Sequence, residues 1–408
     1  MLTQEENDFL TRVGPGTPAG ELLRRYWFPI APMRDLTPEQ PTQFIRLLGE
    51  DLVLFRDKSG RVGLLGDHCS HRGASLLYGR VEERGLACAY HGWLYDVDGK
   101  CLETPAEPAD SKFRLTVKHT AYRVRPFIGM YWAYLGPDPA PEITKYDVWA
   151  APGGTRRVVV QPLLPCNWFQ IMENSADPAH AHILHQEAMA GWGRPKPEST
   201  TRGYNERVAG FDFYEIPFGL MKRRIYKDGI NDEHPLLFPN ALREGNATQI
   251  RVPIDDTHTQ EYFVRFEPAD DPTFVEPNED VRIEYAGPYK DPPDAPYPAG
   301  KYDMSINVQA GDYMAWETQG PISDRTRERL ATADRGVEMF RDMVRREIER
   351  MKRGLDPMSV VRDPDHPIVD TNLQETLKER ALWVRPHYNP ELHKAWMEEE
   401  AAKGATRS

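Results

Sequence analysis

Two cysteines and two histidines, grouped in two short segments, constrain this chain more than any other feature of its sequence. The first segment is Cys69-Ser70-His71 and the second, after sixteen intervening residues, is Cys88-Ala89-Tyr90-His91. Two thiolates and two neutral imidazoles suit either a Zn²⁺ ion or a [2Fe–2S] cluster in which cysteines ligate one iron and histidines the other. The sequence therefore predicts a metal centre held between two loops.

The distribution of the four ligands favours one of these two groups. Zinc modules usually join two ligands of one kind by a short spacer, whereas each segment here contributes one cysteine and one histidine. This arrangement, with Arg72-Gly73 after the first segment and Gly92-Trp93 in the second, resembles a Rieske domain. Neutral imidazoles raise the reduction potential above that of an all-cysteinate cluster, which suits an electron relay. Zinc remains the alternative.

Length, composition and charge limit what else the chain can be. Its 408 residues exceed one core of the usual size, which predicts two domains. With 40% apolar and 28% charged residues and only short apolar runs, we expect a soluble protein rather than a membrane protein. The N-terminus is acidic and lacks the features of a secretory signal, so a cytoplasmic location is expected.

The formal net charge of −12 and the absence of a Lys/Arg block argue against nucleic acid or an anionic membrane as a partner. The two remaining cysteines, Cys101 and Cys166, have no comparable ligands beside them. We expect them to be small buried apolar side chains, since the cysteines are too few and too scattered for a disulfide scaffold.

Turns and apolar runs divide the chain into parts. Residues 1–40 are expected to form a helical lead-in, in which Thr17 is an N-cap, Pro18 takes the first helical position, and the apolar face continues to Trp27. Over residues 41–140, short apolar runs alternate with turns. That texture predicts a small antiparallel β domain.

The remainder, residues 141–408, is expected to be a mixed α and β domain. Residues 167–185 have a helical pattern, 200–265 an extended one, and an apolar stripe over 337–351 predicts an amphipathic helix. The proline-rich stretch 285–300 predicts a loop with little regular structure. The domain is expected to end in long amphipathic helices and a frayed tail over residues 398–408.

The predicted helix over residues 167–185 is dense in potential metal ligands. In an ideal helix, His182 and His185 share a face, whereas His180 and His185 are about 140° apart. Pro178 removes a backbone donor within the segment, so the helix is expected to bend or break there. Both histidine pairs therefore remain open on geometry alone.

The order Asn-x-x-Asp-x-x-His-x-x-x-x-His in this segment, following the cysteine and histidine motif, resembles the α subunit of Rieske ring-hydroxylating oxygenases. The resemblance implies that His180 and His185 ligate a mononuclear Fe(II) together with a carboxylate. It implies that Asp177 links His180 to a cluster histidine of a neighbouring subunit and so conducts electrons. Asn174 would be a nearby polar group, and His182 a packing or surface residue.

The third iron ligand must come from farther along the chain. Residues 312–319 resemble the late Asp-x-x-(aliphatic)-x-Glu-x-Gln helix start of the same family, which implies Asp312 as the carboxylate. Glu317 and Asp324 are rivals. Alternatively, Asp312 only caps a helix, because Gly311-Asp312 is also an ordinary cap sequence.

The resemblance extends over most of the chain and indicates the phthalate-dioxygenase branch, which includes aryl O-demethylases resembling the dehydrodivanillate enzyme. It implies an α+β fold, with an N-terminal antiparallel β Rieske domain and a C-terminal helix-grip domain whose central antiparallel sheet is flanked by helices. The segments with this likeness are residues 11–18, 46–51, 71–76 and 320–325.

The resemblance also implies partners. The α subunits would form a homotrimer or a hexamer of stacked trimers, and a separate reductase with FMN and a [2Fe–2S] centre would supply electrons from NAD(P)H. This chain has no defensible Gly-rich dinucleotide fingerprint, which agrees with NAD(P)H being bound elsewhere.

The sequence indicates less about the substrate. An aromatic acid would need Arg or Lys near the iron, since a guanidinium pairs bidentately with a carboxylate. Arg207, Arg223, Arg224 and Arg243 lie in the region expected to form the pocket wall, and we select Arg207 and Arg243 as substrate-binding candidates. A phthalate-type enzyme would be expected to place an Arg close to Met221, and this departure argues against phthalate itself. The segment over residues 234–240 favours an aryl-ether demethylase.

The expected function is reductive activation of O₂. Electrons would pass from the reductase to the cluster and through Asp177 to the iron, where a small aromatic substrate, carboxylated or methoxylated, is oxidised. Both cis-dihydroxylation and monooxygenation leading to O-demethylation are open. The alternatives are a Rieske electron-transfer protein and a zinc-binding interaction protein without oxygenase activity.

Overall fold

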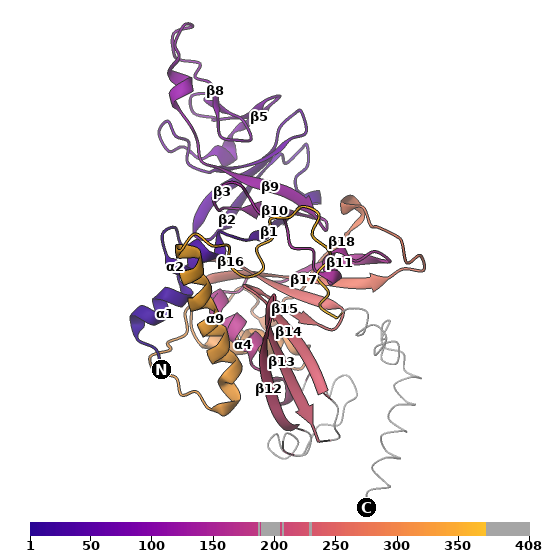
Figure 1. The fold of residues 1–408 in the computed structure, drawn as a ribbon. Helices are drawn as coiled ribbons and strands as arrows, with labels where there is room; N and C mark the ends of the chain where they lie inside the picture. Colours follow the sequence, from indigo (N-terminus) through magenta and orange to yellow (C-terminus); the bar gives the residue numbers. More distant parts are fainter. Residues whose placement is uncertain (187, 189–204, 206–207, 228–230, 373–408) are drawn as a thin grey trace, which may run out of the picture. The chain divides into compact units, whose positions relative to one another are not determined.

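The computed structural model describes residues 1–186, 188, 205, 208–227 and 231–372 (Figure 1). Met1–Thr371 forms one unit and a second unit begins at Asn372. The predicted frayed end of the chain lies outside the described residues. Among the described residues, no helix combines the length and the apolar character that a membrane span requires.

Capping residues set the first two helices. Helix α1 (Gln4–Thr11) begins after Thr3, which forms a capping box with Glu6. Helix α2 (Pro18–Leu23) begins after Thr17, whose side chain accepts a hydrogen bond from a backbone N–H of the first turn. The N-cap and the proline at the first helical position are confirmed.

The predicted continuation of this helix to Trp27 is wrong. Helix α2 ends at Leu23, and Trp27 instead opens strand β1 (Trp27–Pro32). Pro29 and Pro32 lack the backbone N–H that a helix interior needs, so this segment pairs as a strand with a register shift after Pro29. The lead-in thus contributes a strand to the first sheet, and the domain boundaries at 40 and 140 stay predictions.

Two antiparallel sheets make up the N-terminal β domain, as predicted. The larger has six strands in the order β1-β10-β9-β4-β3-β2, and the smaller has the order β5-β6-β7-β8. Their bounds are β2 (Thr42–Leu47), β3 (Glu50–Arg56), β4 (Val62–Gly66), β5 (Arg80–Glu82), β6 (Gly85–Ala87), β7 (Leu94–Tyr95), β8 (Cys101–Glu103), β9 (Ala121–Phe127) and β10 (Met130–Tyr134).

One hydrophobic core lies beneath the loops of this domain. Val53, Phe55 and Leu65 pack in a cluster that also contains Tyr95 and Cys101. Cys101 is fully buried, in agreement with its expected packing role. The core therefore supports the two loops that bear the cysteine and histidine motif.

The second domain is built on an eight-stranded sheet with the order β12-β13-β14-β15-β16-β17-β11-β18. All its pairs are antiparallel except β11 with β18, so the predicted antiparallel sheet is confirmed with one parallel edge. The strands are β11 (Gly154–Val160), β12 (Val208–Ile216), β13 (Gly219–Tyr226), β14 (Asn231–Leu237), β15 (Ala241–Glu244), β16 (Ala247–Asp255), β17 (His258–Pro268) and β18 (Arg282–Tyr285).

Helices cover one face of this sheet (Figure 1). Helix α4 contacts β15 and β16, and α9 contacts α4 and β13. The predicted stripe lies on α9, where Val337, Phe340, Val344 and Ile348 are buried. The helices are α3 (Asp147–Ala150), α4 (Trp168–Ala176), α5 (Ala181–Leu184), α8 (Val308–Thr318) and α9 (Arg335–Lys352).

The proline-rich stretch contains little regular structure, as predicted: only β19 (Lys290–Asp291), which pairs with β20 (Lys301–Tyr302), interrupts it. Short 3₁₀ turns complete the described elements. They are η1 (Met33–Asp35), η2 (Leu76–Tyr78), η3 (Phe113–Thr116), η4 (Asn278–Asp280) and η5 (Thr332–Asp334).

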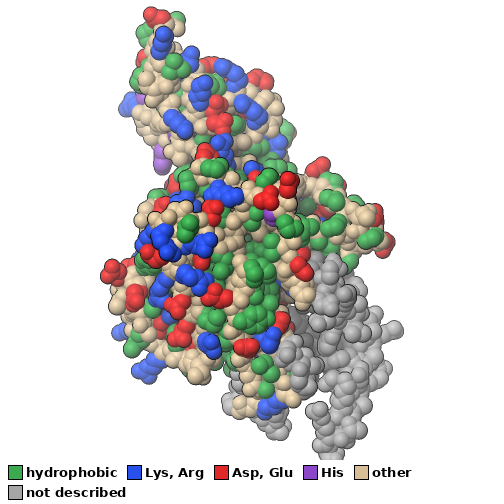
Figure 2. Space-filling model, viewed as in Figure 1, with side chains coloured by type: hydrophobic (Ala, Val, Ile, Leu, Met, Phe, Trp, Pro, Cys, Tyr) green, Lys and Arg blue, Asp and Glu red, His purple; other side chains and the backbone are tan. Residues whose placement is uncertain are grey.

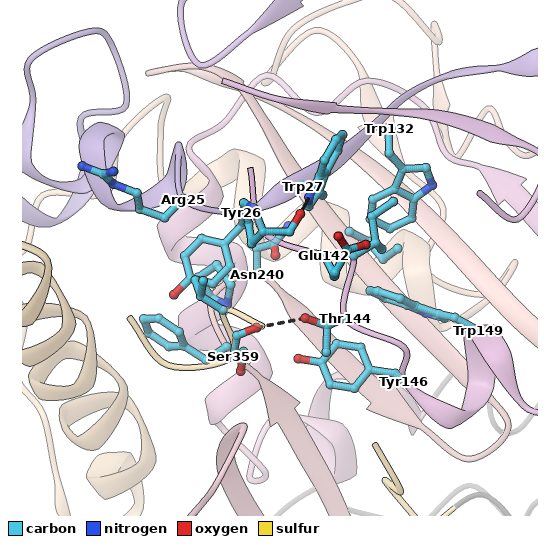
Figure 3. Close-up of a pocket in the computed structure, with 16 residues that line it drawn as sticks. Arg25, Tyr26, Trp27, Trp132, Glu142, Thr144, Tyr146, Trp149, Asn240 and Ser359 are labelled. Carbon is cyan, nitrogen blue, oxygen red and sulfur yellow. Dashed lines mark hydrogen bonds between the residues drawn. The ribbon is translucent and has the colours of Figure 1, made fainter. Parts of the chain in front are cut away.

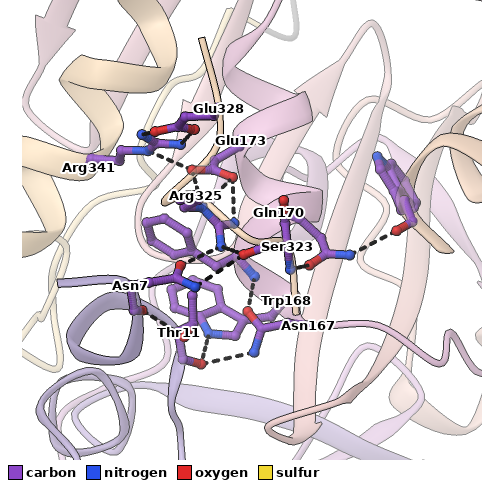
Figure 4. A network of polar contacts seen from close by, with 12 residues as sticks. Asn7, Thr11, Asn167, Trp168, Gln170, Glu173, Ser323, Arg325, Glu328 and Arg341 are labelled. Carbon is purple, nitrogen blue, oxygen red and sulfur yellow. Dashed lines mark hydrogen bonds and ion pairs between the residues drawn. The ribbon is translucent and has the colours of Figure 1, made fainter. Parts of the chain in front are cut away.

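A buried polar network joins helix α1 to the helices of the second domain (Figure 4). Glu173 of α4 accepts hydrogen bonds from Arg325 Nε at 2.9 Å and from Arg341 Nε at 2.7 Å. Arg325 also donates to Asn7 Oδ1 at 2.9 Å, and Arg341 donates to Glu328 at 2.6 Å. Hydrogen bonds and ion pairs of these charged side chains thus connect segments that are far apart in sequence.

Candidate cluster and iron sites

The two loops of the cysteine and histidine motif have the same backbone construction. In the first, Gly73 N–H donates to the carbonyl of Cys69 at 2.8 Å, and in the second, Gly92 N–H donates to that of Cys88 at 2.9 Å. Both glycines have φ +74°, a conformation that favours glycine. Each loop therefore presents its cysteine and histidine in an equivalent way.

The four predicted cluster ligands lie together between these loops. Cys69 and Cys88 are buried, and the rings of His71 and His91 stand 4.5 Å apart between centroids. The Nδ1 atoms of both histidines are buried without a hydrogen-bond partner among the described residues. An unsatisfied buried nitrogen is costly, so an electrophile between the loops would satisfy both imidazoles. The donor set fits a [2Fe–2S] cluster.

Side chains that the sequence analysis did not select surround these ligands. Tyr95 Oη lies 3.2 Å from Cys69 Sγ in a hydrogen bond. The ring of His119 lies 4.6 Å from that of Tyr95, and its two nitrogens contact Ser70 Oγ and Gly66 O, each at 2.7 Å. Tyr95 could have been noticed from its place just after the second loop, whereas nothing near His119 in sequence indicates its role.

The break in the predicted helix occurs where Pro178 lies. Helix α4 ends at Ala176, Asp177 is extended with φ −93° and ψ 113°, and the short helix α5 begins only after His180. His180 and His185 therefore flank α5, and their ring centroids are 5.3 Å apart. The structure brings this pair together.

His182 points elsewhere: its Nε2 lies 3.2 Å from the hydroxyl of Tyr226. This position agrees with the expected packing role. The ideal-helix pair of His182 and His185 is therefore not the pair that the structure brings together with Asp312.

Asp312 completes a group of three with these histidines. Its Oδ1 lies 3.6 Å from His180 Nε2 and 3.4 Å from His185 Nε2, and one ligand atom from each residue lies within 4.8 Å of the others. Asp312 Oδ1 is buried without a hydrogen-bond partner among the described residues. Two imidazoles and one carboxylate are the facial ligand set of non-haem Fe(II).

Burial controls the protonation of this group. It lowers the pKa of His185 to about 3, and it raises the pKa of Asp312 well above its ordinary value, with Glu244 and Glu261 adding to the rise. Neutral imidazoles are the form that binds a metal ion. A divalent cation would reverse the effect on Asp312 by favouring its carboxylate.

The alternative that Asp312 caps a helix is wrong. Helix α8 begins at Val308 and its N-cap is Asn307, whose side chain accepts a hydrogen bond from Ala310 N–H at 2.9 Å. Asp312 lies in the second turn, so the predicted helix start at 312 is also four residues late. Of its rivals, Glu317 binds Lys290 Nζ at 2.9 Å, and Asp324 closes a local turn.

Asp177 lies beside the opposite nitrogen of His180. Its Oδ2 is 3.4 Å from His180 Nδ1, without hydrogen-bond geometry, and its Oδ1 accepts a hydrogen bond from Ala179 N–H at 2.7 Å. Asn174 contributes its backbone carbonyl, which accepts from Asp177 N–H at 3.0 Å. Asp177 thus connects to His180 on the side away from Asp312.

The arginines proposed for substrate binding have different positions. Arg207 lies outside the described residues. Arg243 is buried on β15 and takes part in a polar interaction, Arg224 binds Asp232 Oδ2 at 2.8 Å, and Arg223 lies on the partly exposed face of β13. Arg243 stays a prediction, and Lys222, which was not selected, is buried on β13 together with Arg224.

A small cavity lies apart from both ligand sets (Figure 3). Aromatic side chains dominate its wall, among them Tyr26, Trp27, Trp132, Tyr146 and Trp149. Its volume of about 40 Å³ leaves room for a few water molecules, not for an aromatic substrate. None of the candidate metal ligands lines it.

A Rieske-type β domain, joined to a helix-covered sheet that bears a group of two histidines and one carboxylate, defines a Rieske non-haem iron oxygenase. The comparisons with known proteins agree with this class. Residues 26–121 match the Rieske [2Fe-2S] domain family.

The chain belongs to the family of oxygenase subunits of Rieske non-haem iron oxygenases. It is 40% identical to the 5,5'-dehydrodivanillate O-demethylase oxygenase subunit of Sphingobium sp. (strain NBRC 103272 / SYK-6), over 89% of this chain and 84% of the relative. It is 35% identical to the phthalate 4,5-dioxygenase oxygenase subunit of Pseudomonas putida, over 84% and 85% respectively. It is therefore an oxygenase and one subunit of a multicomponent system.

Solved structures show the same fold. NdmB of Pseudomonas putida CBB5 aligns with a TM-score of 0.60 at 19% identity, over 83% of this chain and 96% of that protein. Dicamba monooxygenase bound to dicamba aligns with a TM-score of 0.54 at 16% identity, over 81% and 98% respectively. At these identities the likeness supports the architecture and not a substrate.

Proposed function

We propose that this oxygenase oxidises a small aromatic substrate, carboxylated or methoxylated, by dihydroxylation or by monooxygenation leading to O-demethylation. The observation behind the proposal is the buried group of His180, His185 and Asp312, which fits Fe(II). The substrate class rests on the relatives, one named for O-demethylation of dehydrodivanillate and one for dioxygenation of phthalate. The higher identity to the first favours O-demethylation.

In this proposal, Cys69, His71, Cys88 and His91 hold the [2Fe–2S] cluster, and His180, His185 and Asp312 hold the iron. When bound, the cluster supplies electrons singly and the iron supplies the site of O₂ activation. Burial keeps His185 neutral, and it leaves Asp312 Oδ1 without a hydrogen-bond partner among the described residues. The protein's task is to hold these donors in place before the substrate arrives.

Asp177 has the second role in the proposal. Its contact with His180 Nδ1 fixes the ring so that Nε2 faces Asp312. We propose that Asp177 also reaches a cluster histidine of a neighbouring subunit in a homotrimer or hexamer, with Asn174 positioning it. Electrons would then enter from a separate reductase that carries FMN and a [2Fe–2S] centre and oxidises NAD(P)H. We place the system in the cytoplasm, together with that coenzyme.

Figure 2 shows acidic and basic side chains interspersed on the face in view. The formal net charge of −12 makes the chain acidic as a whole. A net negative charge without a basic patch argues against nucleic acid or an anionic membrane as a partner. It is compatible with the partners proposed here, a reductase and a small aromatic molecule.

Metal analysis tests the assignment of the ligands. We expect about three irons and two acid-labile sulfides per chain and a Rieske-type electron paramagnetic resonance signal after dithionite reduction. His185→Ala should lose about one iron per chain and keep both sulfides and the signal. His182→Ala is the matched control, because its ring bonds to Tyr226, and it should keep all three irons.

Zinc in place of iron, with no sulfide, would contradict the proposal. So would a His182→Ala variant that loses iron while His185→Ala retains it. Formaldehyde release from a methoxylated aromatic, against formation of a cis-diol, distinguishes the two reaction outcomes.

A further inference from the structure

The inner face of strand β13 carries a lysine that the mechanism above does not use. Along this strand, Leu220, Lys222 and Arg224 are buried, whereas the alternating Met221 and Arg223 are partly exposed. Lys222 is only 3% exposed. Lysine is among the side chains least often buried, and buried lysines normally have a partner.

Lys222 faces the candidate iron site. Phe213 stands directly opposite Lys222 in the β12–β13 register, and its ring lies close to Gly336 of α9 on the helix-covered side of the sheet. Arg224, two residues along the same face, donates from Nε to the carbonyl of Pro178 at 3.2 Å. Alternate residues of a strand share a face, so Lys222 points toward the segment between α4 and α5.

The electrostatics of the site agree with this placement. Burial, the neighbouring His180 and the cations Arg224 and Lys222 together lower the pKa of His185 to about 3. Lys222 also opposes the effect of burial on the pKa of Asp312, which burial raises. Lys222 also lowers the pKa of His180, so the ammonium acts on all three members of the candidate iron group.

The carboxylates near Lys222, namely Asp177, Asp232 and Glu244, accept hydrogen bonds or ion pairs from other groups; Asp177 Oδ1 accepts from Ala179 N–H at 2.7 Å. Asp232 Oδ2 pairs with Arg224 at 2.8 Å, and Glu244 Oε2 accepts a hydrogen bond from Gln249 at 3.1 Å. Lys222 itself forms no hydrogen bond or ion pair with any described residue. Burial lowers its pKa to about 8, so most of it is still protonated near neutral pH. Glu244 and Asp177 favour its charged form, but the ammonium has no direct hydrogen-bond or ion-pair acceptor among the described residues.

We propose that Lys222 binds an anionic oxygen of the substrate, a carboxylate or a phenolate, and so places the aromatic ring beside His180, His185 and Asp312. The inference rests on the proposed function and specifies its substrate class. An ammonium–carboxylate pair is strong in a site shielded from water, and a neutral ligand would leave the lysine unpaired. The sequence analysis expected an arginine close to Met221. In this proposal the cation is instead Lys222, the next residue, whose side chain lies on the opposite face of β13.

Binding measured by isothermal titration calorimetry, under argon and at pH 7.5, tests this role on the metal-loaded protein without turnover. Three probes separate the chemistries: 3-methoxybenzoate for a carboxylate, vanillin for a phenolate, and neutral 3-methoxybenzyl alcohol. We expect at least one anionic probe to bind at least about tenfold more tightly than the alcohol. Whichever anion is preferred identifies the source of the charge.

Variants connect this preference to Lys222. Lys222→Met should abolish the preference for the anion, and Lys222→Arg should keep most of it. Arg223→Met is the matched control, because Arg223 is the next residue, on the other face, and pairs with Glu233. It should bind all probes as the wild type does.

Three outcomes would overturn the inference: equal binding of the neutral and anionic probes by the wild type, no binding of either anion, or a preference that survives in Lys222→Met. The first two comparisons need no variant, so a poorly folded Lys222→Met does not block them. Iron and sulfide assays on the same samples distinguish a failure of the role of Lys222 from a failure of the proposed function. Failure with both metals bound rejects the role of Lys222 alone, whereas their absence rejects the proposed function.

Discussion

Each candidate metal site contains buried nitrogen or oxygen atoms that have no hydrogen-bond partner among the described residues. They are His71 Nδ1 and His91 Nδ1 in the first domain, and His185 Nδ1 and Asp312 Oδ1 in the second. Buried polar groups are satisfied in the great majority of cases. The unpartnered atoms named above belong to candidate metal ligands at two sites far apart in sequence. At the scale of residues, this is why we assign a metal to each site.

Around the first site, the hydrogen bond between Tyr95 and Cys69 has a measurable consequence. Tyr95→Phe removes a donor that stabilises the extra negative charge of the reduced cluster. A bond of about 1 kcal/mol corresponds to roughly 40 mV for one electron, so the midpoint potential should fall by about that amount. Protein-film voltammetry measures it directly.

The exposed Tyr78 provides the control, since Tyr78→Phe touches no cluster ligand and should leave the potential unchanged. An unchanged potential in Tyr95→Phe would show that the hydroxyl does not interact with the reduced cluster.

At the scale of elements, the second site depends on the interruption between α4 and α5. The break at Asp177 ends α4 and sets the direction of the short helix α5, at whose two ends His180 and His185 both face Asp312 of α8. Helix α4 must therefore be held firmly where it ends. The network of Glu173 with Arg325 and Arg341 provides this hold (Figure 4).

Removing Glu173 leaves two buried guanidinium groups without their shared carboxylate. Arg325 is 1% and Arg341 5% exposed in their side chains. Glu173→Gln should lower the free energy of unfolding by about 3 kcal/mol at neutral pH, measured by urea denaturation. Glu349→Gln, which breaks an exposed pair with Lys352, is the control and should cost less than about 1 kcal/mol.

The same network predicts a pH dependence. Burial raises the pKa of Glu173, but Arg325 and Arg341 outweigh it and hold the pKa below its ordinary value. A carboxyl group with a depressed folded-state pKa stabilises the protein above its unfolded-state pKa, and this stability is lost as the pH falls through the folded-state value. The difference between wild type and Glu173→Gln should therefore shrink in acid. A difference that stays constant down to pH 3 would contradict this role.

At the scale of the whole molecule, one domain contains the candidate cluster ligands and the other the candidate iron ligands. Asp177 lies at His180 on the side away from Asp312, where a donor from another subunit could meet it. The proposed oligomer is then part of the electron path and not only a means of stabilising the fold.

Asp177→Asn tests this path. The variant should bind cluster and iron, yet cluster reoxidation in a single turnover should slow by about 10- to 100-fold, because an amide cannot replace the charged link between the two histidines. Asp303→Asn, in an exposed local turn, is the control. Full turnover by Asp177→Asn would exclude the bridging role.

The sequence by itself determined the features whose causes are local in the chain. The cysteine and histidine ligands of each loop are two or three positions apart, and the glycines that close the loops follow within two residues. The cap of α2 at Thr17, the strands over 42–66 and the apolar stripe of α9 likewise depend on neighbouring residues. Short-range patterns of this kind are read from spacing alone.

Only the tertiary structure decided the features that depend on contacts between distant segments. It distinguished His180 from His182, because His180 lies beside Asp312 of α8 and His182 beside Tyr226 of β13, and it turned Trp27 into a strand residue by pairing it with Tyr134. It also placed Lys222 on the inner face of β13. In each case several positions satisfy the local pattern, and packing against elements far along the chain selects one of them.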